Sequence, residues 1–118
     1  MRLIIAGSRN ITVPPEALTW HVMVVERIAA QITSKVVCGM APGIDTVGLA
    51  WARKNGLPVD EHPADWHKHG RAAGPLRNRQ MAANADALLL VWDGKSKGSA
   101  SMKREAEAAG LLIHEVIA

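Results

Sequence analysis

The chain of 118 residues is 48% hydrophobic and 21% charged, a balance that excludes general disorder and suits one domain over residues 1–118. Its formal net charge of +3 favours anionic ligands but does not by itself identify nucleic acid as a partner. One cysteine, Cys38, excludes an internal disulfide, and no apolar run has the length of a signal peptide or a membrane span, so we expect a cytoplasmic protein without a membrane partner.

The first predicted element is a strand over residues 2–6, an apolar run that ends at Gly7-Ser8-Arg9. A helix opened by two prolines follows, because apolar residues then recur every three to four positions. The core face of this helix is predicted to contain Leu18, Val22, Val25, Ile28 or Ala29, and Ile32. A second apolar flank, which packs under a neighbouring element or meets another subunit, consists of Trp20, Met23 and Val24.

A second strand is predicted over residues 35–38, followed by a loop over residues 39–43. The next helix begins near Ile44, with Gly56 as its C-terminal cap. A third, shorter strand over residues 57–62 leads into the longest irregular stretch, residues 63–70.

The second half of the chain repeats the alternation of helix and strand. We predict a helix over residues 74–84, a fourth strand over residues 87–92, a helix over residues 99–109 and a fifth strand over residues 111–117. Such alternation implies right-handed crossovers, and hence an α/β, single-domain, Rossmann-like fold with three layers and a mainly parallel five-stranded sheet. The loops that follow the first four strands then meet at one edge of the sheet.

The loop after the fourth strand, residues 93–99, contains glycines, hydroxyls and lysines before a helix begins. Glycines admit a ligand close to the backbone, Ser96 and Ser99 can donate hydrogen bonds, and free N–H groups at the helix start attract anions. The same residues also suit an ordinary turn at Asp93-Gly94 and an ordinary N-cap at Ser99.

Three further positions have two interpretations each. Arg77, expected in the first turn of its helix with Asn78 and Arg79, either binds an anion or faces water or a nearby aspartate, namely Asp65, Asp86 or Asp93. Asp45 either tightens the loop over residues 39–43 at a helix start or accepts hydrogen bonds from sugar hydroxyls. Trp66 either stacks on a base or packs over its loop.

Several chemistries have no support in the spacing of residues. The histidines near residues 62–69 match no closed zinc pattern, so no metal is expected. Neither Gly39-x-x-x-Gly43 nor the loop after the fourth strand is a dinucleotide fingerprint or a Walker A motif, and no cofactor is expected. Ser8 and Cys38 lack a recognised nucleophile context.

Taken in order, these motifs resemble the YspA-like branch of the SLOG superfamily, also called DUF2493, which is common in bacteria and phages. The resemblance covers nearly the whole chain. It is carried by Gly7-Ser8-Arg9, Gly39-x-Ala41-x-Gly43-x-Asp45, Trp51-Ala52, Pro63-Ala64-Asp65-Trp66, Gly70, Ala73-Gly74-Pro75-x-Arg77-Asn78-x-x-Met81, Ala85-Asp86 and Trp92-Asp93-Gly94-x-Ser96-x-Gly98-Ser99-x-x-Met102.

The resemblance implies a nucleotide or nucleotide-derived ligand, such as ADP-ribose, and a homodimer or larger homo-oligomer. Arg77 falls where the LOG phosphoribohydrolases of this superfamily keep a catalytic arginine, and residues 94–99 fall where they have Pro-Gly-Gly-x-Gly-Thr. The acidic residues that follow that motif are absent here, and the first acid is Glu105. The expected ligand-binding residues are Gly7, Ser8, Arg9, Gly39, Gly43, Asp45, Trp66, Arg77, Asn78, Asp93, Gly94, Ser96, Gly98 and Ser99.

Three functions follow. The first is a sensor or sequestering module that binds a nucleoside phosphate or an ADP-ribose type of ligand. The second is a nucleotide-processing hydrolase related to the LOG enzymes, whose candidate catalytic residues are Arg77, Asp45, Asp93 and Glu105. The third is a single-stranded nucleic-acid binder of the DprA type, which the basic residues favour and the aromatic content of 3% disfavours.

Overall fold

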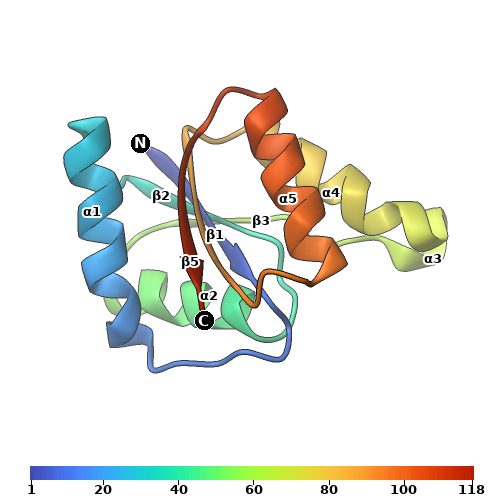
Figure 1. Cartoon of the computed structure of the whole chain (residues 1–118), viewed down its shortest axis with the longest axis horizontal. Helices are drawn as coiled ribbons and strands as arrows, with labels where there is room; N and C mark the ends of the chain where they lie inside the picture. Colours follow the sequence, from blue (N-terminus) through green and yellow to red (C-terminus); the bar gives the residue numbers. More distant parts are fainter.

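The computed structural model describes residues 1–118 and contains all five predicted strands in one parallel sheet of order β3-β2-β1-β4-β5 (Figure 1). The strands are β1 (Arg2–Gly7), β2 (Lys35–Cys38), β3 (Val59–Glu61), β4 (Ala87–Trp92) and β5 (Leu112–Ile117). Every residue of β4 is buried, as are the central residues of β1, because both faces of a parallel sheet are covered. The predicted Rossmann-like α/β fold is therefore confirmed.

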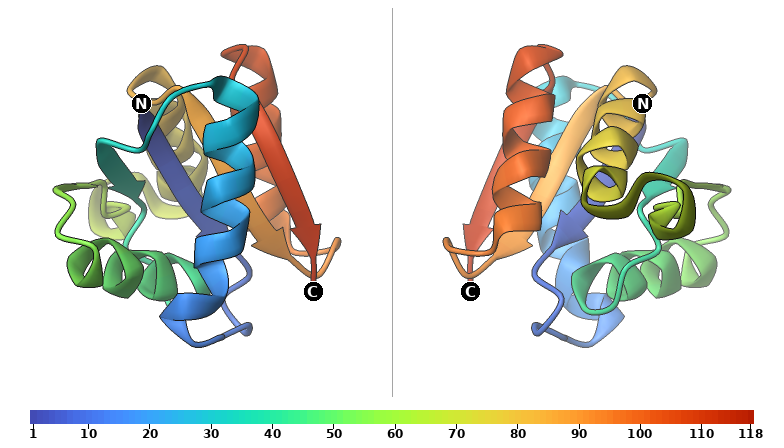
Figure 2. Two further views of the ribbon diagram at one scale, coloured as in Figure 1. Left: turned by 90° about the vertical axis from the view of Figure 1, so that its left-hand side faces the viewer. Right: turned by 90° about the vertical axis from the view of Figure 1, so that its right-hand side faces the viewer.

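Helices cover both faces of the sheet (Figure 2). They are α1 (Thr19–Ala29), α2 (Ile44–Lys54), α3 (Trp66–His69), α4 (Ala73–Ala83) and α5 (Lys97–Ala108), with 3₁₀ turns at Pro15–Leu18 and Gly70–Ala72. One core cluster joins α1 and α2 to the sheet through residues such as Val22 and Trp51, and a second joins α4 and α5 through residues such as Met81 and Met102. None of these helices is both long and apolar enough to cross a membrane.

The chain adds β2 and β3 on one side of β1, and β4 and β5 on the other side. The neighbouring strands β1 and β4 pair from Leu3 with Ala87 to Gly7 with Val91. The chain therefore leaves the carboxyl ends of these two neighbouring strands toward opposite faces of the sheet, which opens a crevice between them. At this point the backbones are close, since a Cβ on Gly7 would lie 1.8 Å from the carbonyl oxygen of Val91.

The predicted core face of α1 is correct only for its first half. Leu18, Val22 and Val25 are buried and Ala29, the alternative to Ile28, is partly buried, whereas Ile28 and Ile32 are 63% and 78% exposed. The reason is that α1 ends at Ala29 and the next residue is left-handed, so Ile32 lies outside the helix. The exposed large apolar side chains are Trp20, Met23, Ile28, Ile32, Trp66, Leu76 and Ile117.

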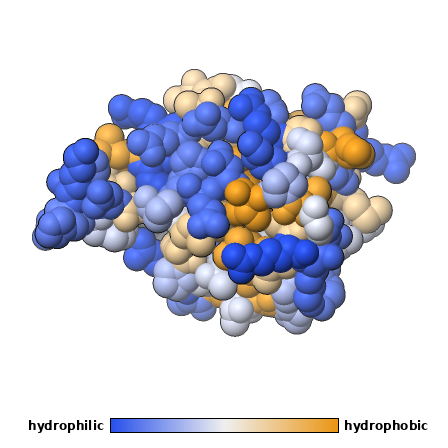
Figure 3. Space-filling view, turned by 180° about the vertical axis from the view of Figure 1, so that it is seen from behind, coloured by the Kyte–Doolittle hydropathy of each residue, from blue (hydrophilic) through white to orange (hydrophobic).

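The rear face is mostly hydrophilic, with apolar side chains gathered near its middle (Figure 3). Trp20 and Met23 on the outer side of α1 do not pack under another element of the chain. A homo-oligomer that covers them stays a prediction.

Four predicted boundaries were wrong. The prolines open a 3₁₀ turn before α1, and the irregular stretch contains α3, because the Asp65 carboxylate accepts a hydrogen bond from the Lys68 N–H at 3.0 Å and caps this short helix. The last helix begins at Lys97 with Ser96 at its N-cap, so Ser99 belongs to its first turn. The third strand is only Val59–Glu61.

Candidate functional site

The loop between β4 and α5 is shaped by Asp93. Its Oδ1 accepts hydrogen bonds from the N–H groups of Lys95 and Ser96, both at 2.8 Å, and these bonds lower the pKa of the carboxyl group. Gly94 has a φ of +80°, which favours glycine. Asp93 therefore holds the loop in place and is not among the residues that line the neighbouring cavity.

Ser8 joins the loop after β1 to the loop after β4. Its buried Oγ lies 3.2 Å from the Ser96 Oγ and accepts a hydrogen bond from the Asp93 N–H at 3.1 Å. The two loops at the crevice are thus tied together by hydrogen bonds between residues far apart in the chain. Ser8 is not among the residues that line the neighbouring cavity.

The start of α5 offers hydrogen-bond donors to a ligand. The first hydrogen bond of the helix runs from the Ala100 N–H to the Ser96 carbonyl oxygen at 3.0 Å, so the N–H groups of residues 97–99 have no acceptor within the helix. Ser99 is 5% exposed and its Oγ has no hydrogen-bond partner. A buried hydroxyl without a partner is unfavourable, and a ligand in the adjacent cavity would supply one.

Arg77 lies in the second turn of α4 rather than in the predicted first turn, and it is buried instead of facing water. It pairs with none of the three aspartates considered from the sequence, since its guanidinium donates to the Gly39 carbonyl oxygen and, at 2.9 Å, to the Asn78 Oδ1. Burial lowers the pKa of Arg77. A Cβ on Gly39 would lie 2.9 Å from this guanidinium and 2.7 Å from the Asp45 Oδ2, which explains the glycine.

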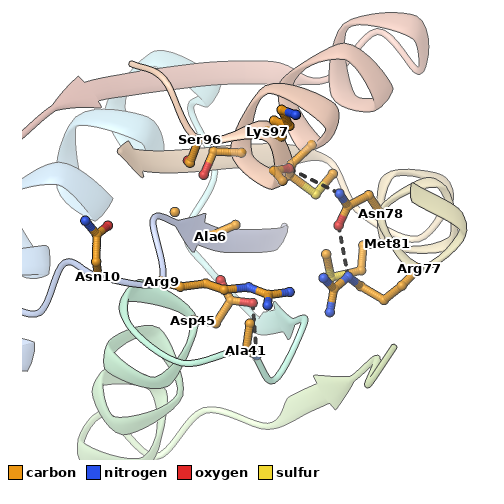
Figure 4. Close-up of a pocket in the computed structure, with 14 residues that line it drawn as sticks. Ala6, Arg9, Asn10, Ala41, Asp45, Arg77, Asn78, Met81, Ser96 and Lys97 are labelled. Carbon is orange, nitrogen blue, oxygen red and sulfur yellow. Dashed lines mark hydrogen bonds between the residues drawn. The ribbon is translucent and has the colours of Figure 1, made fainter. Parts of the chain in front are cut away.

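Asp45, near the start of α2, is buried beside this arginine. Its Oδ2 accepts a hydrogen bond from the Ala41 N–H at 3.3 Å. Burial raises the pKa of Asp45 to about 6, although this hydrogen bond and the positive charges of Arg77 and Arg9 partly oppose the rise. Arg9 extends above Asp45 toward Arg77 (Figure 4).

This raised pKa predicts a pH effect on stability. Between the ordinary pKa of 3.8 and about 6, the folded protein keeps the Asp45 proton while the unfolded chain releases it, so this contribution to stability is lost as the pH rises through about 6. Relative to Asp45→Asn, we expect the wild-type free energy of unfolding to fall by roughly 2–3 kcal/mol from about pH 4 to about pH 7.5. Urea denaturation of both proteins at both pH values measures this, and parallel pH curves would contradict it.

Most of the predicted ligand-binding residues surround one cavity of about 290 Å³, called here the inner cavity. The predicted residues that line it are Gly7, Arg9, Asp45, Arg77, Asn78, Ser96, Gly98 and Ser99. Its other lining residues, which the sequence did not single out as a group, are Ala6, Asn10, Ala41, Met81, Lys97 and Met102. Asp45 is the only acid among them, beside the cations of Arg9, Arg77 and Lys97.

A second cavity of about 280 Å³, called here the outer cavity, contains Trp66 and Arg71. The Trp66 ring is about half exposed, and the guanidinium carbon of Arg9 lies 5.5 Å from its centroid. Gly74 leaves room for the ring, since a Cβ there would make a tight contact of 3.3 Å with it. No sequence pattern distinguished Arg71 from the other basic residues, because its place beside the cavity depends on the fold of residues 63–72.

The remaining candidates lie outside both cavities. Gly39 lines a smaller neighbouring cavity with Trp66, Gly43 lines a groove beside α2, and Gly94 is exposed in its turn. Glu105 pairs with Arg79 through atoms 3.5 Å apart. Burial raises the pKa of Cys38 to about 11, so its thiol stays protonated near neutral pH and is a poor nucleophile.

Comparisons with known proteins place these features in a family. The model of the YspA, cpYpsA-related SLOG family matches residues 1–69, a stretch that includes Arg9, Asp45 and Trp66. The gene 61 protein of Mycobacterium phage D29 is 36% identical over 95% of this chain and 93% of that protein. No solved structure matches the chain at a significant level.

Proposed function

Because the chain belongs to the YspA, cpYpsA-related SLOG family, we propose that it binds a nucleotide or nucleotide-derived ligand at the crevice between β1 and β4, as a sensor or sequestering module. Membership of this family confirms the resemblance seen in the sequence and supports a nucleotide-related function in general terms. The specific ligand and the mode of binding are inferred from the cavity.

One observation carries the proposal. The start of α5 combines free N–H groups with the unpartnered, buried Ser99 hydroxyl, and this donor set lines a cavity that also contains Arg9 and Arg77. Helix N-termini of this kind bind phosphate, and an arginine fork can bond two phosphate oxygens at once. Asp45, beyond the phosphate position, suits ribose hydroxyls.

Thermal denaturation with a panel of nucleoside monophosphates, nucleoside diphosphates and ADP-ribose tests the proposal. We expect at least one of them to raise the melting temperature, because a ligand that binds only the folded state stabilises it. Gly98→Val should weaken binding of that ligand by roughly tenfold or more, because Gly98 lines the cavity and a bulkier side chain there reduces the space left for a ligand beside the start of α5.

Ala108→Val is the matched control, since it places a valine at an exposed position at the far end of α5. It should bind the ligand as the wild type does. A panel that leaves the melting temperature of the wild-type protein unchanged would contradict nucleotide binding.

A hydrolase is the second candidate, and a single observation favours it. Of the three acidic candidates, only Asp45 lines the inner cavity with Arg77, and a pKa of about 6 suits an acid or base near neutral pH. Chromatography of the same nucleotides after long incubation distinguishes the two functions. Product that forms with the wild type but not with Asp45→Asn supports hydrolysis, and unchanged nucleotides at high protein concentration contradict it.

A further inference from the structure

Two histidines face each other where α1 packs on β5, away from the crevice. The His21 Nδ1 lies 3.3 Å from the His114 Nε2, and the centroids of the two rings are 5.4 Å apart. Both residues are partly buried, and neither lines the inner or the outer cavity. The other hydrogen bonds of α1 side chains run to Trp51 of α2 and to the Thr33 N–H. The histidine pair is therefore the polar side-chain contact between α1 and the sheet.

The pair belongs to the contact that covers one face of an edge strand. β5 has β4 as its only neighbour in the sheet. Leu112 and Val116, two residues before and after His114, pack against the same core cluster as Val22 of α1. Because side chains alternate along a strand, His114 lies on this face between them. The packing of α1 on β5 thus combines apolar contacts with one hydrogen-bonded pair of histidines.

The other ionisable residues near the pair belong to α1, to the turn before it and to β5, because β4 has none. They are Glu16, Glu26, Arg27 and Glu115. The three carboxylates accept hydrogen bonds from the Lys54 Nζ, the Thr33 N–H and the Lys103 Nζ, respectively, and Arg27 is exposed. Lys103 belongs to α5, which covers the opposite face of β5. Neither histidine ring is therefore paired with a carboxylate that would stabilise its charged form.

Protonation changes this contact in two steps. A neutral imidazole has one N–H donor and one acceptor nitrogen, whereas an imidazolium has two donors and no acceptor. The hydrogen bond survives one proton, because a charged ring can donate to a neutral one. A second proton brings two N–H groups and two positive charges against each other. Burial, and to a lesser extent the charge of His21, lower the pKa of His114, in agreement with this arrangement.

We propose that the His21–His114 pair is a pH-sensitive switch, which stabilises the packing of α1 on the edge strand β5 near neutral pH and weakens it when both rings are protonated. Loosening of α1 uncovers the face of β5 that contains Leu112 and Val116. This inference is independent of the ligand proposed for the crevice.

The direction of the pH effect follows from the lowered pKa of His114. Its contribution to stability is complete above the ordinary value of 6.5 and is lost as the pH falls through the folded-state value, because the unfolded chain then binds the proton more tightly. The effect has the opposite sign to that of Asp45, whose contribution is lost as the pH rises.

Amide hydrogen exchange followed by NMR at about pH 7.5 and about pH 5 tests the switch, since the two values lie on either side of the ordinary histidine pKa. We expect the protection factors of α1 to fall by about fivefold in acid relative to those of α5, the loss expected for one neutral hydrogen bond. α5 is the internal reference because it packs in the other core cluster and contains no histidine. Protection of α1 that keeps the same ratio to α5 at both pH values would overturn the switch.

His21→Gln separates titration from packing, because a glutamine amide can donate to or accept from His114 in either protonation state. We expect this variant to lose the acid-induced loosening of α1, and the pKa of His114, measured from its ring signals, to rise toward its ordinary value. His67→Gln is the matched control, since it removes an exposed histidine from α3, at the opposite end of the molecule from α1 (Figure 1). It should respond to acid as the wild type does. Loosening of α1 that is as large in His21→Gln as in the wild type would show that another group is responsible.

Discussion

Arg77→Ala is expected to abolish nucleotide binding, with an affinity loss of about 100-fold or more. The side chain lines both cavities and is the most buried of the cations in the site. Removing one partner of a buried, charge-assisted contact costs roughly 2–5 kcal/mol. Calorimetric titration with the nucleotide that most raises the wild-type melting temperature measures the loss.

Arg79→Ala is the matched control on the same helix. The Arg79 side chain is 73% exposed and pairs with Glu105 away from the cavities, so its removal should leave affinity within about twofold. Arg77→Lys keeps the charge but loses the fork that bonds two oxygens, and we expect an intermediate affinity. Nucleotide binding by a folded Arg77→Ala variant at wild-type strength would exclude this residue from the site.

Gly7→Ala is expected to destabilise the protein by about 4 kcal/mol or more, which is most of the stability of many small domains. The new Cβ would lie 1.8 Å from the Val91 carbonyl oxygen and 2.9 Å from the Ile44 Cβ. The first contact is with the backbone of the neighbouring strand, so relief requires β1 and β4 to move apart at their carboxyl ends. Urea denaturation, or the loss of soluble folded protein, measures the effect.

Gly98→Ala provides the contrast. A Cβ at Gly98 meets no atom within 4 Å, and the residue lies in the first turn of α5, so alanine should leave stability unchanged or raise it by up to about 1 kcal/mol. If Gly7→Ala were as stable as Gly98→Ala, the close approach of β1 to β4 at this position would be wrong.

Local patterns in the sequence were enough to predict the elements of the fold. The apolar runs that became β1 and β4 are long, and buried strands need little more than such a run between turn residues. Gly56, predicted as the cap of α2, has a φ of +67°, because a helix end that turns in this way favours glycine. Where the prediction differed from the structure, as at Ile28 and at the start of α5, the residues lie in the first or last turn of a helix. The periodic pattern of apolar residues does not define these terminal turns.

The amino-acid sequence by itself determined the α/β alternation, and with it the edge of the sheet at which the polar loops meet. Only the tertiary structure showed that Arg77 is buried and donates hydrogen bonds to Gly39 and Asn78. It also showed that the Asp93 carboxylate accepts a hydrogen bond from its own loop, and that two cavities have lining residues in common. The physical reason is that strand formation depends on neighbouring residues, whereas the burial and charge environment of Arg77 depend on residues 38 positions away in the chain.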